Sequence, residues 1–229
     1  MNLFVTGTDT GVGKTFITAG IAAELASEGA KVGVYKPVET GAPKNADKKF
    51  FSNDLEFIKK IAPQVQTKSS YLLEIPAAPM VSADVEDVVI EKNIIKKDYE
   101  ELSKTCDIVI VEGAGGLMVP FAKDFLAADI AKMFNMPVLI VAKPDLGTIN
   151  HTLLTIEFAK KKGLKIAGVV INNYPENTTD VAIKTAPMII QKFSDIPYLA
   201  TVPKNLNPFG AGVAELVAKN LSIPILFAK

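Results

Sequence analysis

Residues 6–15 read TGTDTGVGKT and follow a short apolar run at residues 3–5. The residues after this stretch have the apolar spacing of a helix, so it lies where a strand turns into a helix. A glycine-rich turn at such a place binds phosphate, because its backbone N–H groups and the helix dipole face the anion. Lys14 would then reach the β- and γ-phosphates of a nucleotide, and the Thr15 hydroxyl would bind Mg²⁺.

The match to the usual phosphate-loop pattern G-x-x-x-x-G-K-[ST] is incomplete. Thr8 occupies the position of the first glycine, and Gly7 lies one residue too early, whereas the core GVGKT at residues 11–15 is intact. A turn that only caps a helix and ends in a surface lysine is the alternative. The strand before the turn and the helix after it favour a phosphate-binding loop.

The composition favours one globular domain without nucleic-acid or membrane partners. The chain has 229 residues, of which 48% are hydrophobic, and a formal net charge of +0, so we expect a single domain over residues 1–229 with a large core. All 25 basic residues are lysines. An arginine finger from this chain or an identical copy is therefore excluded, and phosphoryl charge must be met by lysine, Mg²⁺ and backbone N–H groups.

Cysteine content and hydropathy indicate where the protein works. Cys106 is the only cysteine; an internal disulfide is excluded, and a packed small hydrophobe is expected there rather than a nucleophile. No apolar run approaches 18 residues, so no membrane span is expected. The N-terminal residues lack a basic signal-peptide region. We expect a cytoplasmic protein.

Short apolar runs alternate with helical patterns along the chain. This alternation predicts a single doubly wound α/β domain of the P-loop NTPase type, with a mostly parallel sheet flanked by helices. Residues 41–49 are expected to form a mobile loop, and residues 63–90 to form extended stretches and turns. Strands are predicted at residues 2–6, 32–36 (ended by Pro37), 108–111, 138–141, 166–171 and 198–202, and helices at 16–27, 52–61, 91–103, 125–134, 150–162, 179–193 and 211–219.

Polar residues gather where the predicted strands end, which is where such sheets bind ligands. Lys36 ends one strand beside the phosphate loop, although a surface lysine is the alternative. Glu112 ends another, where a carboxylate is costly unless it meets a cation; we expect Mg²⁺, with a salt bridge to lysine as the alternative. The glycines at 113, 115 and 116 let backbone approach a ligand, unless they only connect elements. Asn172 and Asn173 end a third strand.

Two further polar residues are ambiguous. Asp54 stands near a helix start, where a carboxylate usually serves the cap and the dipole. His151 is the only histidine, and we expect it to be packed or to cap a helix. No Ser/His/Asp or Cys/His nucleophilic arrangement and no zinc spacing is present in the sequence.

These motifs together resemble the dethiobiotin synthetases of the biotin pathway, over essentially the whole chain. The matching segments are FVTGTDT at residues 4–10, VGKT at 12–15, YKPV at 35–38, VEGAGG at 111–116, LG at 146–147, INH at 149–151, AG at 167–168 and Asn172. The order of the GTDT, YKPV and VEGAGG motifs is specific to that family.

The resemblance implies a role for each matching residue. Lys36, Lys14 and Thr10 are implied to be catalytic. Thr15, Asp54 and Glu112 are implied Mg²⁺ ligands, which replaces the capping role for Asp54. Nucleotide contacts are implied for Gly11, Val12, Gly13, Lys14, Thr15, Phe16, Asp54, Glu112, Gly113, Ala114, Gly115, Asn172, Asn173, Pro203, Lys204 and Asn205, and substrate contacts for Thr10, Lys36, Thr40, Gly115, Gly116, Leu117, Gly147, Thr148 and Asn150.

The implied reaction is an ATP-dependent, Mg²⁺-dependent carboxylation and ring closure of 7,8-diaminopelargonic acid with CO₂. It passes through a carbamate and a carbamic–phosphoric anhydride and yields dethiobiotin, ADP and phosphate. The resemblance also implies a homodimer in which the turn at residues 147–150 reaches the substrate carboxylate across the interface. The sequence shows three departures: Gly11 stands where at least one relative has an acidic residue, residues 179–193 have no counterpart of a relative's carboxylate-binding tyrosine, and residues 203–205 lack the expected aromatic. Base selectivity and the carboxylate contact stay open.

Two other functions share the predicted fold. A dimeric switch ATPase of the partition or division-site type would carry a lysine where Asp9 stands. An ATP-dependent amide-forming enzyme of cobyric acid synthesis would need a glutaminase domain with a nucleophilic cysteine, for which the chain has neither the length nor a suitable residue.

Overall fold

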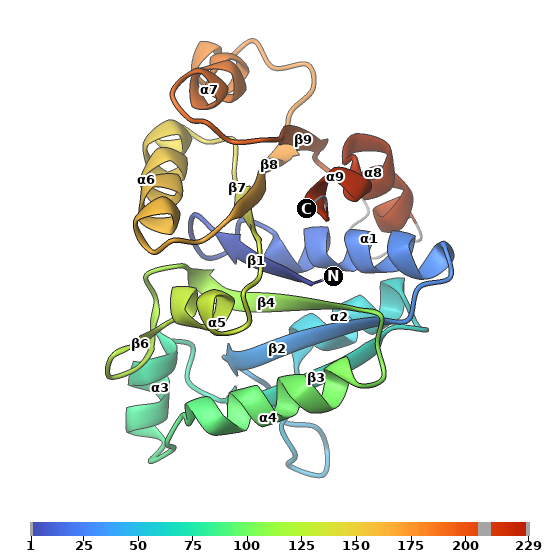
Figure 1. Ribbon diagram of the computed structural model, residues 1–229, viewed down its shortest axis with the longest axis vertical. Helices are drawn as coiled ribbons and strands as arrows, with labels where there is room; N and C mark the ends of the chain where they lie inside the picture. Colours follow the sequence, from blue (N-terminus) through green and yellow to red (C-terminus); the bar gives the residue numbers. More distant parts are fainter. Residues whose placement is uncertain (1, 206–211, 228–229) are drawn as a thin grey trace.

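The computed structural model describes residues 2–205 and 212–227. Within them, seven strands form one sheet: β1 (Leu3–Gly7), β2 (Val32–Thr40), β3 (Gln66–Leu73), β4 (Ile108–Gly116), β7 (Val138–Ala142), β8 (Ile166–Tyr174) and β9 (Leu199–Pro203). Their order is β3-β2-β4-β1-β7-β8-β9, and every pairing is parallel (Figure 1). A separate antiparallel hairpin joins β5 (Pro120–Ala122) and β6 (Phe125–Leu126).

Helices cover both faces of this sheet, which makes the fold doubly wound. One apolar cluster includes residues of α4 (Lys92–Ser103), α5 (Ala127–Met133), α6 (Thr148–Lys161) and α7 (Val181–Lys192). The other includes residues of α1 (Lys14–Ser27), α2 (Asn53–Ile61), α8 (Gly212–Asn220) and α9 (Ile223–Leu226). A short helix, α3 (Pro79–Val85), lies near the hairpin (Figure 1).

The apolar residues of β1 pack on both faces of the sheet. Leu3 and Val5 belong to one cluster and Phe4 to the other, because successive side chains of a strand point to opposite faces. All five residues of β1 are buried. The predicted single α/β fold with a parallel sheet is confirmed.

The prediction that Pro37 ends the second strand is wrong. Strand β2 continues to Thr40, and Lys36 and Val38 still pair with β3 on either side of the proline. Pairing with β4 stops at Tyr35, so the absent N–H of Pro37 interrupts no ladder on that side. Likewise β4 continues through residues 112–116, where a turn was expected. Both strands therefore carry their polar residues farther along the sheet than the sequence indicates.

Residues 63–90 are more regular than the predicted stretches and turns. They contain β3 and then α3, with Pro79 in the first turn of the helix, a position that needs no backbone N–H donor. Of the predicted helix at 211–219, Ala211 lies outside the described residues, and α8 begins at Gly212. No described helix is long and apolar enough to span a membrane.

Candidate active site

The phosphate loop connects β1 to α1 through two glycines with positive φ. Gly13 precedes the helix with a φ of 93°, and Gly11 has a φ of 73°. A Cβ on Gly13 would lie 2.0 Å from Nδ2 of Asn172. That amide is buried and donates a hydrogen bond of 3.0 Å to the carbonyl of Val12. The close packing of β8 on the loop thus requires glycine at residue 13.

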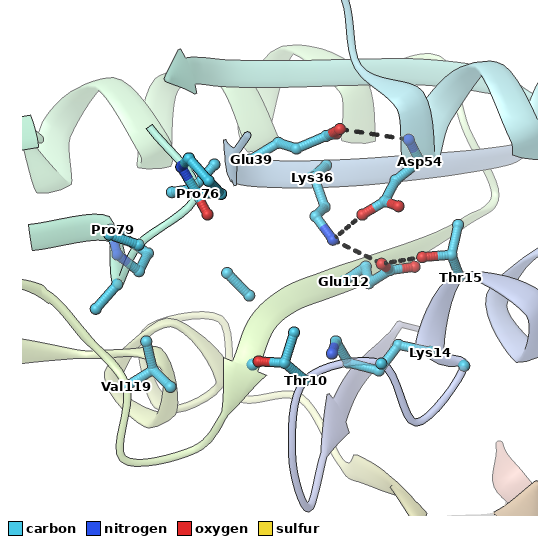
Figure 2. Close-up of a pocket in the computed structure, with 17 residues that line it drawn as sticks. Thr10, Lys14, Thr15, Lys36, Glu39, Asp54, Pro76, Pro79, Glu112 and Val119 are labelled. Atoms are coloured by element: carbon cyan, nitrogen blue, oxygen red, sulfur yellow. Dashed lines mark hydrogen bonds and ion pairs between the residues drawn. The ribbon is translucent and has the colours of Figure 1, made fainter. Parts of the chain in front are cut away.

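The centre of the site is an ion cluster around Lys36. Its ammonium lies 2.5 Å from Oδ2 of Asp54 and 2.7 Å from Oε1 of Glu112 (Figure 2). Lys36 is 3% exposed and Glu112 is fully buried, so the surface-lysine alternative is wrong. The capping role for Asp54 is also wrong, because Ser52 caps α2 while the Asp54 carboxylate turns to Lys36. Three separate elements, β2, α2 and β4, supply the cluster.

Lys36 and Asp54 keep their charges despite burial because they attract each other. Burial lowers the pKa of Lys36, but the Glu112 and Asp54 carboxylates outweigh burial and raise it above its ordinary value. Burial raises the pKa of Asp54, and the attraction of Lys36 outweighs it, so the pKa of that carboxyl is lowered. Burial, together with nearby Lys36, lowers the pKa of Lys14. Near neutral pH Lys36 therefore stays an ammonium and Asp54 a carboxylate.

Glu112 provides the test of whether the site fits Mg²⁺. Its Oε1 accepts the Thr15 hydroxyl at 2.8 Å and the Lys36 ammonium. Its Oε2 is buried and has no partner among the described residues, which is costly for a carboxylate oxygen without a cation. Mg²⁺ is bound by one or two carboxylates, phosphate oxygens and water. Thr15, Glu112 and the adjacent Asp54 fit that ion.

These residues line a cavity of about 630 Å³ at the carboxyl ends of β1, β2 and β4. It brings together Thr10, Lys14, Thr15, Lys36, Thr40, Asp54, Glu112 and Gly115, together with Gly11, Gly13 and Ala114. Sequence reasoning missed Glu39, the wall formed by residues 76–79, and Val119 (Figure 2). Glu39 was missed because the strand was expected to end before it.

A second cavity of about 600 Å³ adjoins the phosphate loop. Phe16, Asn172, Asn173 and Asn205 line it, as the resemblance implied for the nucleotide. Pro203 and Lys204 do not line it. Phe51 and Phe57 do, and they supply aromatic surface that residues 203–205 lack. No local pattern marks these two phenylalanines as ligand contacts.

A third cavity of about 450 Å³ lies beyond Thr10, between the phosphate loop and α6. Gly116 and Leu117 line it, and so does His151. The prediction of a packed or capping His151 is wrong, because its side chain is exposed. The turn with Gly147, Thr148 and Asn150 begins α6 but lines none of the three cavities.

Known proteins are similar to this chain over most of its length. A family model described as an AAA domain matches residues 1–207. An ATP-dependent dethiobiotin synthetase of Caldicellulosiruptor saccharolyticus is 39% identical over 227 residues, which cover 96% of this chain and 91% of that protein. The chain belongs to the dethiobiotin synthetase family.

Other members of the dethiobiotin synthetase family are similar over comparable lengths. The protein of Thermodesulfovibrio yellowstonii is 35% identical, with 98% of each chain covered. That of Anoxybacillus flavithermus is 37% identical, with 89% of this chain and 92% of that protein covered. The sequence resemblance is thereby confirmed, and the family's name identifies an enzyme of the ligase class.

Solved structures outside the dethiobiotin synthetase family share the fold. The MinC:MinD cell division protein complex of Aquifex aeolicus aligns with a TM-score of 0.60 at 16% identity, over 99% of this chain and 94% of that chain. Cobyrinic acid a,c-diamide synthase of Mycobacterium smegmatis, with bound ADP and magnesium, aligns with a TM-score of 0.59 at 17% identity, over 95% and 92%. At such low identity these likenesses establish the fold alone.

Proposed function

We propose that this chain joins CO₂ to 7,8-diaminopelargonic acid (7,8-diaminononanoate) and closes the ureido ring of dethiobiotin at the expense of ATP. Family membership supports the overall reaction. The observation that carries the proposal is the buried ion cluster of Lys36, Asp54 and Glu112 in a cavity that opens beside the phosphate loop. A small-molecule ligase needs such a charged cavity next to the γ-phosphate.

The proposed chemistry has three steps. One amine of the substrate attacks CO₂ and loses a proton, which gives a carbamate. A carbamate oxygen attacks the γ-phosphorus of ATP, the bond to ADP breaks, and a carbamic–phosphoric anhydride forms. The second amine attacks the carbonyl carbon of this anhydride and loses a proton, the C–O bond to phosphate breaks, and the ring closes.

The second step brings an anionic carbamate to an anionic phosphate, so positive charge must lie between them. Lys14 lies in the first turn of α1 and lines the cavity together with Lys36. Asp54 and Glu112 hold the Lys36 ammonium from two directions, which fixes its position without rearrangement during the reaction. Thr10, Thr40, Gly115, Gly116 and Leu117 complete the proposed substrate contacts.

The nucleotide and Mg²⁺ are assigned from the same residues. Thr15, Asp54 and Glu112 would hold Mg²⁺, which when bound neutralises charge on the β- and γ-phosphates. The remaining proposed nucleotide contacts belong to two groups. The first comes from the phosphate loop, the start of α1 and β4 and comprises Gly11, Val12, Gly13, Lys14, Phe16, Gly113, Ala114 and Gly115. The second comes from the ends of β8 and β9 and the residues after β9 and comprises Asn172, Asn173, Pro203, Lys204 and Asn205.

A homodimer is part of the proposal. Large apolar side chains are exposed at the third cavity: Met118 is 65% exposed and Leu154 61%. Single exposed apolar residues are ordinary, but a group beside a functional cavity is typical of an interface. The turn with Gly147, Thr148 and Asn150 would then contact the substrate carboxylate in the other subunit. A cytoplasmic location without nucleic-acid or membrane partners also belongs to the proposal.

The test is phosphate release with ATP, Mg²⁺ and bicarbonate, in the presence and absence of the diamine. We expect release to depend on the diamine and to disappear in Lys36→Ala. Replacing ATP by other nucleoside triphosphates measures base selectivity. ATP hydrolysis that ignores the diamine would contradict the proposal and favour a dimeric switch ATPase of the partition or division type.

A further inference from the structure

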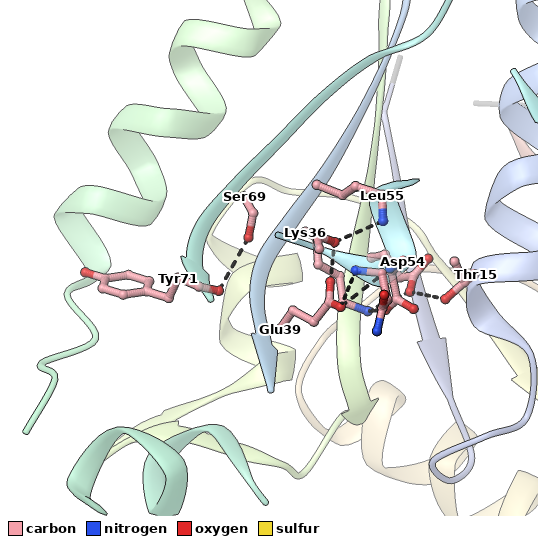
Figure 3. A network of polar contacts seen from close by, with 10 residues as sticks. Thr15, Lys36, Glu39, Asp54, Leu55, Ser69 and Tyr71 are labelled. Atoms are coloured by element: carbon pink, nitrogen blue, oxygen red, sulfur yellow. Dashed lines mark hydrogen bonds and ion pairs between the residues drawn. The ribbon is translucent and has the colours of Figure 1, made fainter. Parts of the chain in front are cut away.

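Glu39 connects the end of β2 to the beginning of α2. Glu39 is 6% exposed and lines the cavity that holds Lys36. It belongs to the polar network with Lys36 and Asp54 that Figure 3 shows. Oε1 accepts the backbone N–H of Asn53 at 2.9 Å and, at 3.5 Å, that of Asp54. Oε2 accepts the hydroxyl of Ser52. One buried carboxylate therefore holds three consecutive residues at the helix N-terminus.

Ser52 links the Glu39 carboxylate to the backbone of α2 through hydrogen bonds. It is the N-cap of α2, and its Oγ accepts the backbone N–H of Leu55 at 2.9 Å while its O–H is donated to Glu39. The hydroxyl is thus held from both sides, and the first helical turn cannot rotate without breaking one of these bonds. The helix dipole of α2 also stabilises a negatively charged carboxylate at this position.

Asp54 lies in the turn that Glu39 holds, and its carboxylate is 2.5 Å from the Lys36 ammonium. We propose that Glu39 is a positioning residue for the ligase reaction: it orients the first turn of α2 so that Asp54 meets Lys36 and the Mg²⁺ position. Glu39 acts through Asp54 and does not itself contact the reacting atoms. The inference rests on the proposed function, because its kinetic effect is measured in that reaction.

A plain helix cap elsewhere in the chain provides the matched control. Asp180 caps α7 and accepts the backbone N–H groups of Ala182 and Ile183 at 2.8 and 3.3 Å. It lines none of the three cavities. Asp180→Ala therefore removes a comparable cap without affecting Lys36.

The experiment compares wild type with Glu39→Leu, Glu39→Gln, Ser52→Ala and Asp180→Ala. Amide hydrogen exchange at residues 53–55, which needs no substrate, is expected to be at least about tenfold faster in Glu39→Leu and Ser52→Ala. In the same two variants kcat should fall about tenfold or more, because a small displacement of a charged group has such an effect. Calorimetric binding of a non-hydrolysable ATP analogue should become less dependent on Mg²⁺.

Glu39→Gln keeps an acceptor for the Asn53 amide and should retain most of the wild-type kcat, whereas Asp180→Ala should change exchange only at α7. Unchanged exchange at residues 53–55 in Glu39→Leu and Ser52→Ala would overturn the inference. So would faster exchange with unchanged kcat and Mg²⁺ dependence, which would make Glu39 only a cap.

If phosphate release by the wild-type protein does not depend on the diamine, the proposed function fails. Hydrogen exchange and Mg²⁺-dependent binding of the ATP analogue still decide the role of Glu39 in that case. Ser52→Ala keeps the test available if Glu39→Leu does not fold.

Discussion

The ammonium of Lys36 and Oε1 of Glu112 lie 2.7 Å apart, and the two side chains are 4% and 0% exposed. A buried pair of this kind adds little net stability, because removing both charges from water offsets their attraction. Removing only one partner of the pair is costly, because the charge of the other then stays buried without water or an opposite charge. The pair therefore indicates a functional requirement for charge at this place.

Replacing Lys36 by methionine should leave Glu112 buried without a cation. We expect the free energy of unfolding to fall by about 3–5 kcal/mol in the absence of Mg²⁺ and diamine-dependent phosphate release to be lost. Thermal or urea denaturation in EDTA measures the first effect. The double variant Lys36→Met/Glu112→Gln should recover part of the stability but none of the activity. Equal stability of the single and double variants would show that the pair is not coupled.

The pH dependence of stability should reflect Asp54 at low pH. Lys36, against the effect of burial, lowers the pKa of Asp54 in the folded state. Such a carboxylate contributes stability above its unfolded pKa of about 3.9 and loses that contribution as pH falls through the lower, folded value. We expect the Tm of wild type to fall more steeply than that of Asp54→Asn below about pH 4. Asp195→Asn, at a fully exposed carboxylate, should keep the wild-type profile.

The contribution of Lys36 to stability changes with pH in the opposite direction. Its pKa is raised in the folded state, because Glu112 and Asp54 outweigh the effect of burial. Its contribution is therefore fully present below the unfolded pKa of about 10.4 and is lost as pH rises through the folded value. In thermal denaturation the contribution of Lys36 to stability should not decrease up to about pH 10. A decline below that pH in wild type that Lys36→Met lacks would contradict the raised pKa.

Gly13→Ala and Gly11→Ala separate two effects in the phosphate loop. Both glycines have positive φ, but a Cβ would meet Asn172 at residue 13 and nothing within 4 Å at residue 11. Gly11→Ala should cost about 1–2 kcal/mol of stability from the backbone alone. Gly13→Ala should cost more and should also weaken binding of an ATP analogue, measured by calorimetry. Equal binding losses in the two variants would exclude the contact with Asn172 as the cause.

Thr15→Val removes the hydroxyl that Glu112 accepts. We expect the Mg²⁺ concentration for half-maximal phosphate release to rise at least about tenfold, because the variant loses a proposed Mg²⁺ ligand as well as a contact that supports Glu112. Thr15→Ser keeps the hydroxyl and should stay near wild type. EDTA should abolish release in all three proteins. A Thr15→Val enzyme with the wild-type Mg²⁺ dependence would exclude Thr15 from the metal site.

The proposed homodimer is tested by placing a charged side chain among the exposed apolar residues at the third cavity. Met118→Lys beside the third cavity should produce monomers in sedimentation and lower the activity. Met188→Lys on α7 is the matched control, because Met188 is 62% exposed and Met118 65%, and it should leave sedimentation unchanged. A Met118→Lys variant that sediments like wild type would contradict the proposed interface.

The predictable part of the molecule is encoded in short stretches of chain. The parallel sheet follows from apolar runs separated by helical patterns, and the phosphate loop follows from residues 11–15 together with the strand and helix that flank them. The polar ends of β2, β4 and β8 could also be located, because parallel strands end at one edge of the sheet. The resemblance implied separate roles for Lys36, Asp54 and Glu112, but it did not imply that the two carboxylates contact the lysine.

The unpredicted part depends on long-range packing. The end of β2 was misjudged because a proline stops a strand only where its N–H has a ladder partner, and β4 diverges from β2 at Tyr35. Phe51 and Phe57 enter the second cavity because α2 packs beside α1. His151 is exposed on α6 although the helix around it is half-buried. None of these three features can be predicted from the neighbouring residues in the sequence.

The sequence by itself therefore determined the class of fold, the phosphate loop and the family, because each depends on the order and spacing of neighbouring residues. Only the tertiary structure decided that Glu39 holds the start of α2 and that Asp54 and Glu112 meet at one ammonium. The physical reason is that these residues come from separate elements, which adjacent positions in the sheet and packing of α2 bring within hydrogen-bond distance.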